Sequence, residues 1–478
     1  MPVLLVTLLW RVPSLFDPPW VNDEGTYFAV AQAMAHGYRL YAGVWENKLP
    51  AIYLFYGAVY HVFGPSLIAI RLLTSLDVLL LVVAVFAFAS NFYSMRSALF
   101  AALLTGVLMG VPFLEGTTGN AETFLALFSA TAMYLGLVRR APGLAGLAMA
   151  IAVLFKAVAG FDAIALGLWF LLHERQNLPR YGGAIFGVLA LTSLVTAFLG
   201  IFPAMIRDAI FYDLGYVGHA NGSAVPWLLL VKLVLLCSIS FLLRRAPFPY
   251  LWLLYATAGA FVSGRFFGHY GLQMVAPLTL SVAAAAPRFT ARNRALVALA
   301  VALVVAVAGT SVAGWALAAA GHDSILARRL QYYPNFARYA LQTESYDTYR
   351  SQVDDHVNRN IAVAALVAAG PPGNLLIWGN TPWIYVLSHR LPATAYTSAV
   401  RDPAVPGETK ALDRSLTGLR PTQVVVIDPP LPPIRNNARS ALLLGYRAAG
   451  SIANARVLVR EPSPSRLAES ARTTARTR

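Results

Sequence analysis

Residues 67–90 read LIAIRLLTSLDVLLLVVAVFAFAS, an apolar run as long as the hydrocarbon core of a bilayer requires, which is about 20 helical residues. Similar runs recur along the chain, in which 58% of the 478 residues are hydrophobic and only 12% are charged. Together they predict an all-α, multi-pass membrane bundle. The predicted spans are 2–16, 67–90, 97–113, 121–138, 143–157, 159–172, 182–201, 226–243, 248–264, 270–287 and 295–320.

Residues 143–172 admit two interpretations, one long helix or two short helices that turn near Gly160. Cytoplasmic loops carry an excess of basic residues, and two short helices put the arginines that flank the spans on one side. These arginines are Arg96, Arg139, Arg140, Arg175, Arg180, Arg244, Arg245, Arg288, Arg292 and Arg294. We therefore expect two helices and about eleven crossings. With this topology, the segments that lie on the extracytoplasmic face are the 17–66 loop, the 202–225 loop, Arg265 and everything after residue 320.

The net charge of +15 would suggest a nucleic-acid partner in a soluble protein. Here the arginines lie between apolar spans, where they orient the helices, so we expect membrane lipids and no nucleic acid as partners. The first run lacks a basic leader and a cleavage site, which indicates a retained anchor in the cell membrane. No P-loop, GxSxG motif or zinc-type Cys/His cluster occurs, so ATP-driven transport and serine hydrolysis lack support.

From residue 321 the sequence becomes mixed and polar, with strand-like runs at 374–379, 423–428 and 455–461. We therefore predict a transmembrane module over residues 1–320 and an extracytoplasmic α/β domain over residues 321–461. Residues 462–478 are rich in Ser, Thr, Arg, Ala and Pro, which predicts a disordered tail.

The loop 17–66 is unusually long for a connection without a function. It contains the carboxylate doublet Asp23-Glu24 and then the segment WENKLPAIY at 45–53. Charges at the rim of a lipid-embedded bundle are costly unless they are solvated or paired, so the doublet suggests a site where water, a cation or a polar substrate enters. The alternative is a loop that only packs on the bundle and turns its charges to water.

The arrangement of Asp23-Glu24, then Lys48 and Pro50, then Arg71 at the start of the second span resembles the GT-C superfamily, specifically the protein O-mannosyltransferase and aminoarabinose-transferase-like family (glycosyltransferase family 39). A second resemblance is GRFFGHY at 264–270. The resemblance implies transfer of a sugar from a polyprenyl-phosphate donor to a protein, lipid or glycan acceptor at the extracytoplasmic face, with inversion at the anomeric carbon.

The residues suit that chemistry. A carboxylate at the membrane surface can take the acceptor proton, and we choose Asp23, with Glu24 beside it, as the catalytic group. Cations stabilise the leaving phosphate, for which Lys48, Arg265 and Arg71 are candidates. An arginine at a helix end also commonly snorkels to the interface, which is the alternative for Arg71.

A divalent cation such as Mg²⁺ or Mn²⁺ is a further candidate, with Glu46, His219 and His269 as ligands. The family places its ligating glutamate directly before the motif lysine, where this chain has Asn47, so the carried-over site is in doubt. The alternative for each histidine is an ordinary hydrogen-bonding role.

Glu122 is a candidate for the acceptor side of the cavity, although a carboxylate in the first turn also suits the dipole of its helix. Lys156 and Asp162 flank the turn between the two short helices, where we expect them to be solvated. Trp378 and Trp383 can stack on a saccharide, but a Trp beside a strand is more often core.

Two other function classes compete with an enzyme. A transporter or flippase of a lipid-linked sugar would use the same charges to line a path, but the sequence lacks the paired halves with interrupted helices typical of transporters. A catalytically inactive scaffold conflicts with the intact Asp23, Glu24 and Lys48. The long outer loop and the appended outer domain favour the enzyme.

Overall fold

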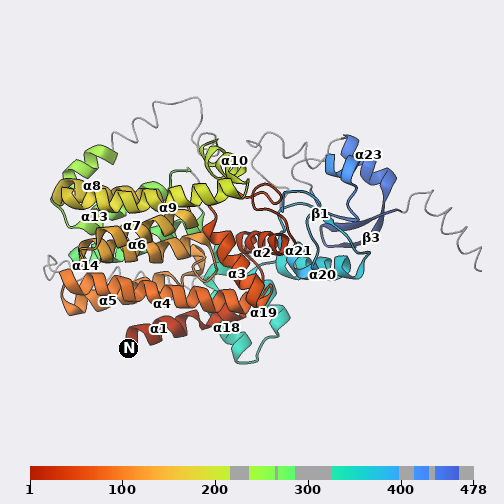
Figure 1. The fold of residues 1–478 in the computed structure, drawn as a ribbon. Coiled ribbons are helices and arrows are strands. Elements are labelled where there is room, and N and C mark those ends of the chain that lie inside the picture. Colours follow the sequence, from red (N-terminus) through yellow and green to blue (C-terminus); the bar gives the residue numbers. More distant parts are fainter. Residues whose placement is uncertain (216–235, 264–266, 286–324, 398–413, 430–435, 462–478) are drawn as a thin grey trace, which may run out of the picture. The chain divides into compact units, whose positions relative to one another are not determined.

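The computed structural model describes residues 1–215, 236–263, 267–285, 325–397, 414–429 and 436–461 (Figure 1). The chain divides into two compact units. One, the bundle unit, comprises residues 1–24 and 46–355, and the other, the sheet unit, comprises residues 25–45 and 356–478. Helix α2 (Asn22–Ala35) crosses the boundary, so its first turn lies in the bundle unit and the rest in the sheet unit.

The bundle unit consists of helices. In chain order they are α1 (Pro2–Arg11), η1 (Val12–Phe16), α3 (Ala51–Phe63), α4 (Leu67–Phe92), α5 (Met95–Leu108), η2 (Pro112–Leu114), α6 (Ala121–Leu137), α7 (Pro142–Phe155), α8 (Ala159–His173), η3 (Arg175–Asn177), α9 (Leu178–Phe198), α10 (Phe202–Met205), η4 (Ile206–Phe211), α13 (Phe248–Ala260), η5 (Gly268–Gly271), α14 (Leu272–Ala285), α17 (Ile325–Leu330), α18 (Tyr332–Ala340) and α19 (Tyr346–Val353). Ser66 caps α4 by accepting a hydrogen bond from the Ala69 amide at 3.3 Å, and Ser94 caps α5 in the same way from Ser97 at 3.2 Å.

The long helices pack side by side, α4 against α5, α6 against α7, and α7 against α9 (Figure 1). In the part of the chain that the structure describes, two helices are long and apolar enough to cross a membrane, Leu67–Phe92 and Arg175–Phe198, and the other apolar helices are shorter. The second of these exposes large apolar side chains such as Phe198, at 91%. An apolar outer face suits contact with lipid tails.

Two helices, α7 and α8, occupy residues 143–172, as the favoured interpretation requires. The break between them lies at residues 156–158 and not at Gly160. The number of crossings stays a prediction, because the predicted span 295–320 lies outside the described residues and 226–243 is described only from residue 236.

The buried carboxylate of Asp17, after α1, forms hydrogen bonds with the segment 325–355. The oxygens of Asp17 accept hydrogen bonds from Tyr332 Oη and Tyr349 Oη, each at 2.9 Å. Tyr333 stacks on Trp10, with ring centroids 4.1 Å apart. Because buried polar groups are costly unless they are paired, these contacts explain why α18 and α19 belong to the bundle unit.

The sheet unit contains a four-stranded sheet in the order β1-β2-β4-β3. Strands β1 (Leu375–Trp378) and β2 (Gln423–Ile427) are parallel, whereas β4 (Ala455–Arg460) runs antiparallel to β2 and to β3 (Tyr446–Ile452). Three of the four strands coincide with the predicted strand-like runs. The accompanying helices are α20 (His356–Ala369), α21 (Trp383–Ser388) and α23 (Asn436–Gly445), and an irregular helix, η7, covers Ser415–Leu419.

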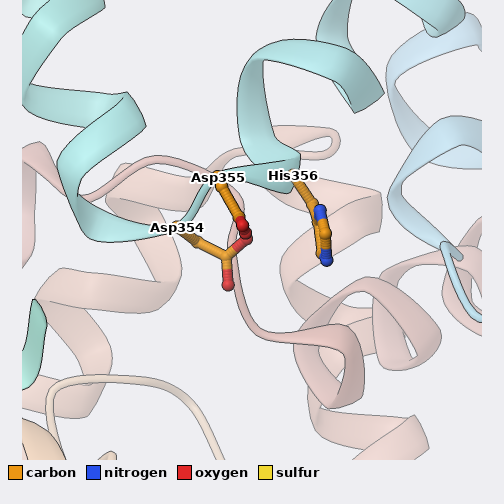
Figure 2. A group of neighbouring side chains, drawn as sticks. All are labelled: Asp354, Asp355 and His356. Carbon is orange, nitrogen blue, oxygen red and sulfur yellow. The ribbon is translucent and has the colours of Figure 1, made fainter. Parts of the chain in front are cut away.

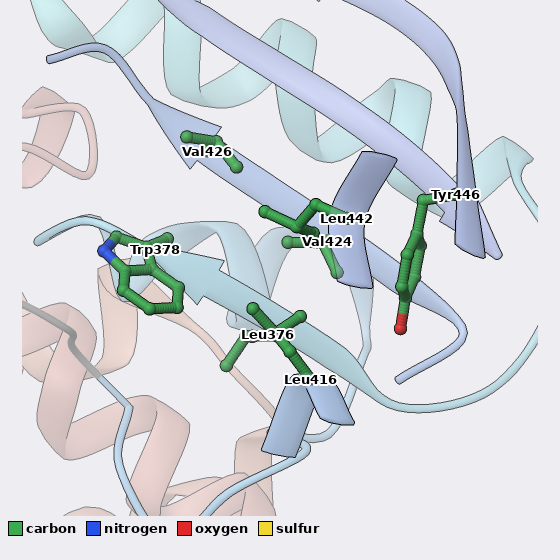
Figure 3. Close-up of a cluster of buried hydrophobic side chains, with 7 residues drawn as sticks. All are labelled: Leu376, Trp378, Leu416, Val424, Val426, Leu442 and Tyr446. Carbon is green, nitrogen blue, oxygen red and sulfur yellow. The ribbon is translucent and has the colours of Figure 1, made fainter. Parts of the chain in front are cut away.

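The core of the sheet unit lies on one face of the sheet, where seven buried side chains meet (Figure 3): Leu376, Trp378, Leu416, Val424, Val426, Leu442 and Tyr446. Trp383 is also buried and packs against α2, where a Cβ at Gly25 would lie only 2.8 Å from its ring. Both tryptophans are therefore core residues and do not offer a stacking surface to a saccharide.

Candidate active site

Asp23 is the accessible carboxylate of the doublet. It lies in the first turn of α2, where a negative charge suits the helix dipole. Its Oδ2 lies 3.6 Å from Lys48 Nζ, and the two side chains are 38% and 13% exposed. The two residues that the sequence placed in different parts of the first outer loop are therefore neighbours, with the carboxylate still open to solvent.

Glu24 points the other way, because consecutive helical residues project about 100° apart. It is fully buried, its Oε1 is bonded to Arg71 Nη1, and the same oxygen accepts the Gly119 amide at 2.6 Å. Arg71 is equally buried and approaches the Thr117 carbonyl at 3.4 Å. Arg71 thus points into the bundle and does not snorkel to the interface.

The turn that carries Lys48 is held by the side chain of Tyr53. Tyr53 Oη donates to Glu46 Oε2 at 2.5 Å and accepts the Lys48 amide at 3.2 Å, while the Asn47 amide approaches Glu46 Oε2 at 3.2 Å. Burial alone would lower the pKa of Lys48, but the carboxylates of Asp23, Glu46 and Glu122 outweigh burial and leave that pKa raised. Lys48 therefore remains a cation.

A second charged group forms around Glu122 in the first turn of α6. Glu122 is buried and its Oε1 is bonded to Lys156 Nζ, which also lies 4.4 Å from the centre of the Tyr270 ring. His269 Nε2 lies 3.8 Å from the same carboxylate oxygen, and His269 Nδ1 contacts Glu115 Oε2 at 2.9 Å. Burial would lower the pKa of His269, but Glu122 and Glu115 raise it above its usual value, which favours an imidazolium.

The expectation that Lys156 and Asp162 are simply solvated was wrong. Asp162 is fully buried, where it accepts hydrogen bonds from Ser129 Oγ at 2.8 Å and from Gln273 Nε2 at 3.1 Å. Lys156 is bonded to Glu122. The Glu122 carboxylate is therefore paired with a lysine and is not simply solvated at the helix terminus. Sequence reasoning missed these contacts because the partners lie on helices far apart in the chain.

Asp213 is a further carboxylate, which no sequence motif singles out. Its Oδ1 accepts a hydrogen bond from Asn47 Nδ2 at 3.2 Å, which joins the segment after α10 to the turn of Lys48. Burial raises its pKa to about 6, against the opposing effect of Lys48 and Lys156. Gly119, whose amide binds Glu24, is three residues before Glu122 in the chain, so the two charged groups are neighbours in the bundle unit.

The three predicted metal ligands are not seen together. His219 and the phosphate candidate Arg265 lie outside the described residues, Glu46 is bonded to Tyr53, and His269 is bonded to Glu115. In the described ranges, three or more metal-type side chains approach one another, within 4.8 Å, only at the consecutive residues Asp354, Asp355 and His356 (Figure 2). Two of these three are exposed, and exposed acidic groups are common without an ion, so the divalent cation stays a prediction.

Comparison with known proteins places this geometry on a known fold. No protein-family model matches the sequence, and no curated protein does so. Among solved structures, ArnT from Cupriavidus metallidurans bound to undecaprenyl phosphate matches with a TM-score of 0.62 at 16% identity, over 97% of this chain and 98% of that chain. The apo form matches with a TM-score of 0.61 at 17% identity over the same shares. An oligosaccharyltransferase from Archaeoglobus fulgidus, in complex with Zn and sulfate, matches with a TM-score of 0.47 at 15% identity, over 88% and 67% of the two chains.

At 16% to 17% identity, the two matches to ArnT establish a shared fold. The chain has the fold of ArnT over almost the whole length of both proteins, as the resemblance noted in the sequence led us to expect.

Proposed function

We propose that this protein is an integral membrane glycosyltransferase, which transfers a sugar from a polyprenyl-phosphate donor to an acceptor on the extracytoplasmic face, with inversion. The observation that carries the proposal is the pairing of a solvent-accessible carboxylate, Asp23, with a fixed cation, Lys48, at 3.6 Å. The fold shared with ArnT, solved with undecaprenyl phosphate bound, supports a lipid-linked donor.

In the proposed reaction the acceptor oxygen attacks the anomeric carbon while the bond from that carbon to the phosphate oxygen breaks. Asp23 takes the proton of the acceptor, and the bonding electrons leave with the phosphate. Lys48 stabilises the charge that gathers on the leaving phosphate, and its raised pKa keeps it protonated for this task.

We assign Glu24 and Arg71 to positioning. Both side chains are fully buried and bonded to each other, and Glu24 also binds the Gly119 amide. An arginine that is buried and paired in this way is poorly placed to reach a lipid phosphate. The pair instead fixes the first turn of α2, from which the neighbouring Asp23 projects toward Lys48.

The test uses the purified full-length protein in lipid nanodiscs, with radiolabelled polyprenyl-phosphate sugars and candidate acceptors. A positioned general base contributes about 10²- to 10⁴-fold to a rate, so Asp23→Asn is expected to reduce transfer by at least about 100-fold. The matched control is Asp355→Asn, an exposed aspartate in the same unit, which is expected to leave transfer unchanged. Undiminished transfer by Asp23→Asn would remove this carboxylate from the role of base.

The same assay distinguishes an enzyme from a transporter or flippase. A glycosyltransferase forms a glycosylated acceptor and releases the polyprenyl phosphate in equal amounts in a detergent solution without compartments. A transporter leaves the donor chemically intact under those conditions. Intact donor with every acceptor class would contradict the proposed function.

A further inference from the structure

The break between α7 and α8 is braced by two other helices of the bundle unit, α14 and α6. Lys156 has an extended backbone between the two helices, with φ −157° and ψ 130°. Gln273 of α14 donates from Nε2 both to the Val158 carbonyl at 3.2 Å and to Asp162 Oδ1 at 3.1 Å, and Ser129 of α6 donates to Asp162 Oδ2. Because carbonyls freed by a helix break are costly in a bundle, these bonds stabilise the break where it is.

The effect of the brace is to hold Lys156 at the charged region. Its side chain is 16% exposed, so the ammonium is neither solvated at the surface nor sealed in the core. The ammonium bonds Glu122 and lies over the Tyr270 ring. Glu122 itself is buried and has His269 as a second basic neighbour at 3.8 Å, so one carboxylate faces two basic side chains.

Lys156 and Lys48 lie in adjoining parts of the bundle unit, because Phe155, next to Lys156, stacks on Phe124 with ring centroids 5.3 Å apart, and Phe55, which follows Lys48 in the chain, lies 4.6 Å from the Phe124 ring. Glu122, the partner of Lys156, acts electrostatically on Lys48, and both lysines act on the carboxylate of Asp213. A phosphate monoester has three terminal oxygens and carries close to two negative charges when it leaves, which one ammonium group compensates only in part. Arg71 is buried against Glu24 and does not supply the second charge.

We propose that Lys156 is a second phosphate-binding cation, which acts with Lys48 on the lipid-linked phosphate and is held in place by Glu122 and the Gln273–Asp162–Ser129 brace. This inference rests on the proposed function. Glu122 is the counterion of Lys156 before the phosphate binds. Glu122 therefore fixes the orientation of the lysine side chain, and it also competes with the phosphate for the ammonium group. The lysine ammonium has three donors, and it can bond the carboxylate and a phosphate oxygen together.

The test measures equilibrium binding of a radiolabelled polyprenyl phosphate to the full-length protein in nanodiscs, with the neutral polyprenol as the control ligand. Removing Lys156 alone would leave Glu122 buried without its partner, which endangers folding. The informative comparison is therefore Glu122→Gln against the double variant Glu122→Gln, Lys156→Met. These two proteins differ only in the ammonium group of Lys156.

We expect Glu122→Gln to bind polyprenyl phosphate at least as tightly as the wild type, because it removes a competitor. We expect the double variant to bind it about tenfold more weakly or worse, and Lys156→Arg in the Glu122→Gln background to retain binding. Equal binding by the single and double variants would overturn the proposal and leave Lys156 as a counterion of Glu122 only. Equal weakening toward the neutral polyprenol would also overturn it, because the loss would then not concern the phosphate.

Failure of this inference is distinguishable from failure of the proposed function. The binding measurement requires no turnover, whereas the transfer measurement with Asp23→Asn does. If the wild-type protein binds polyprenyl phosphate through Lys156 but leaves every donor intact, the proposed glycosyltransferase activity is contradicted and the proposed phosphate-binding site is supported.

Discussion

Replacing Arg71 with methionine tests whether its role is structural or catalytic. Arg71 and Glu24 are both fully buried and bonded to each other. The substitution leaves the Glu24 carboxylate with the Gly119 amide as its remaining hydrogen-bond donor among the contacts described above. Breaking a buried ion pair by removing one partner costs about 3–5 kcal/mol, because an uncompensated charge stays in the interior.

The double variant Glu24→Gln, Arg71→Met supplies the matched control. It removes both charges and keeps an amide oxygen that can accept from Gly119, so its stability is expected to lie close to that of the wild type. Tryptophan fluorescence during thermal and denaturant unfolding in detergent measures these differences, together with the fraction of monodisperse protein after heating.

The positioning role of Arg71 is contradicted if Arg71→Met unfolds like the wild type and loses only donor binding. In that case Arg71 would be a phosphate ligand, as the sequence first suggested, and its burial against Glu24 would describe a resting arrangement. Restored stability in the double variant, with most of the transfer activity, would support the positioning role.

Two further predictions concern the charges around Asp23. Lys48→Met is expected to reduce the rate of transfer by about 100-fold or more, as loss of an electrostatic stabiliser does. Its unfolding midpoint should stay close to that of the wild type, because Lys48 and Asp23 are both partly exposed. A normal rate in steady-state kinetics would exclude Lys48 as the phosphate cation. Asp213 has its pKa raised by burial to about 6, so the stability that it contributes is present below its unfolded value of 3.8 and is lost as the pH rises through about 6. Its ionisation also offsets the positive charge of Lys48 and Lys156, so donor affinity should fall over the same range. Asp213→Asn should abolish both trends in unfolding and binding measured from pH 4 to pH 8, and unchanged pH profiles would show that another group is responsible.

The sequence predicted those parts of the molecule that depend on local patterns. Apolar runs located α1, α4 to α9, α13 and α14, because burial in lipid needs a continuous apolar segment, and strand-like apolar runs located β1, β2 and β4. Helices such as α2, α3, α18 and α19 are not among the predicted spans. The resemblance to a known family nominated Asp23 and Lys48 together, and the structure places them 3.6 Å apart.

The remaining contacts depend on how distant helices pack, which no local pattern encodes. Glu122 and Lys156 are 34 residues apart in the chain, and Asn47 and Asp213 are 166 residues apart, yet each pair is in contact. The doublet Asp23-Glu24 looked like one functional unit, but the geometry of a helix turns its two carboxylates in different directions. Asp23 is accessible to solvent whereas Glu24 is buried, and this difference in burial depends on tertiary packing.

The most direct test of the central claim is a time course of polyprenyl-phosphate release from a radiolabelled donor, with purified wild-type protein and with Asp23→Asn at matched donor occupancy. We predict that the wild type releases polyprenyl phosphate in step with formation of a glycosylated product of inverted anomeric configuration, and that Asp23→Asn binds the donor normally but releases almost none. Equal release by the two proteins, or a product of retained configuration, would contradict the assignment of Asp23 as the base of a direct displacement.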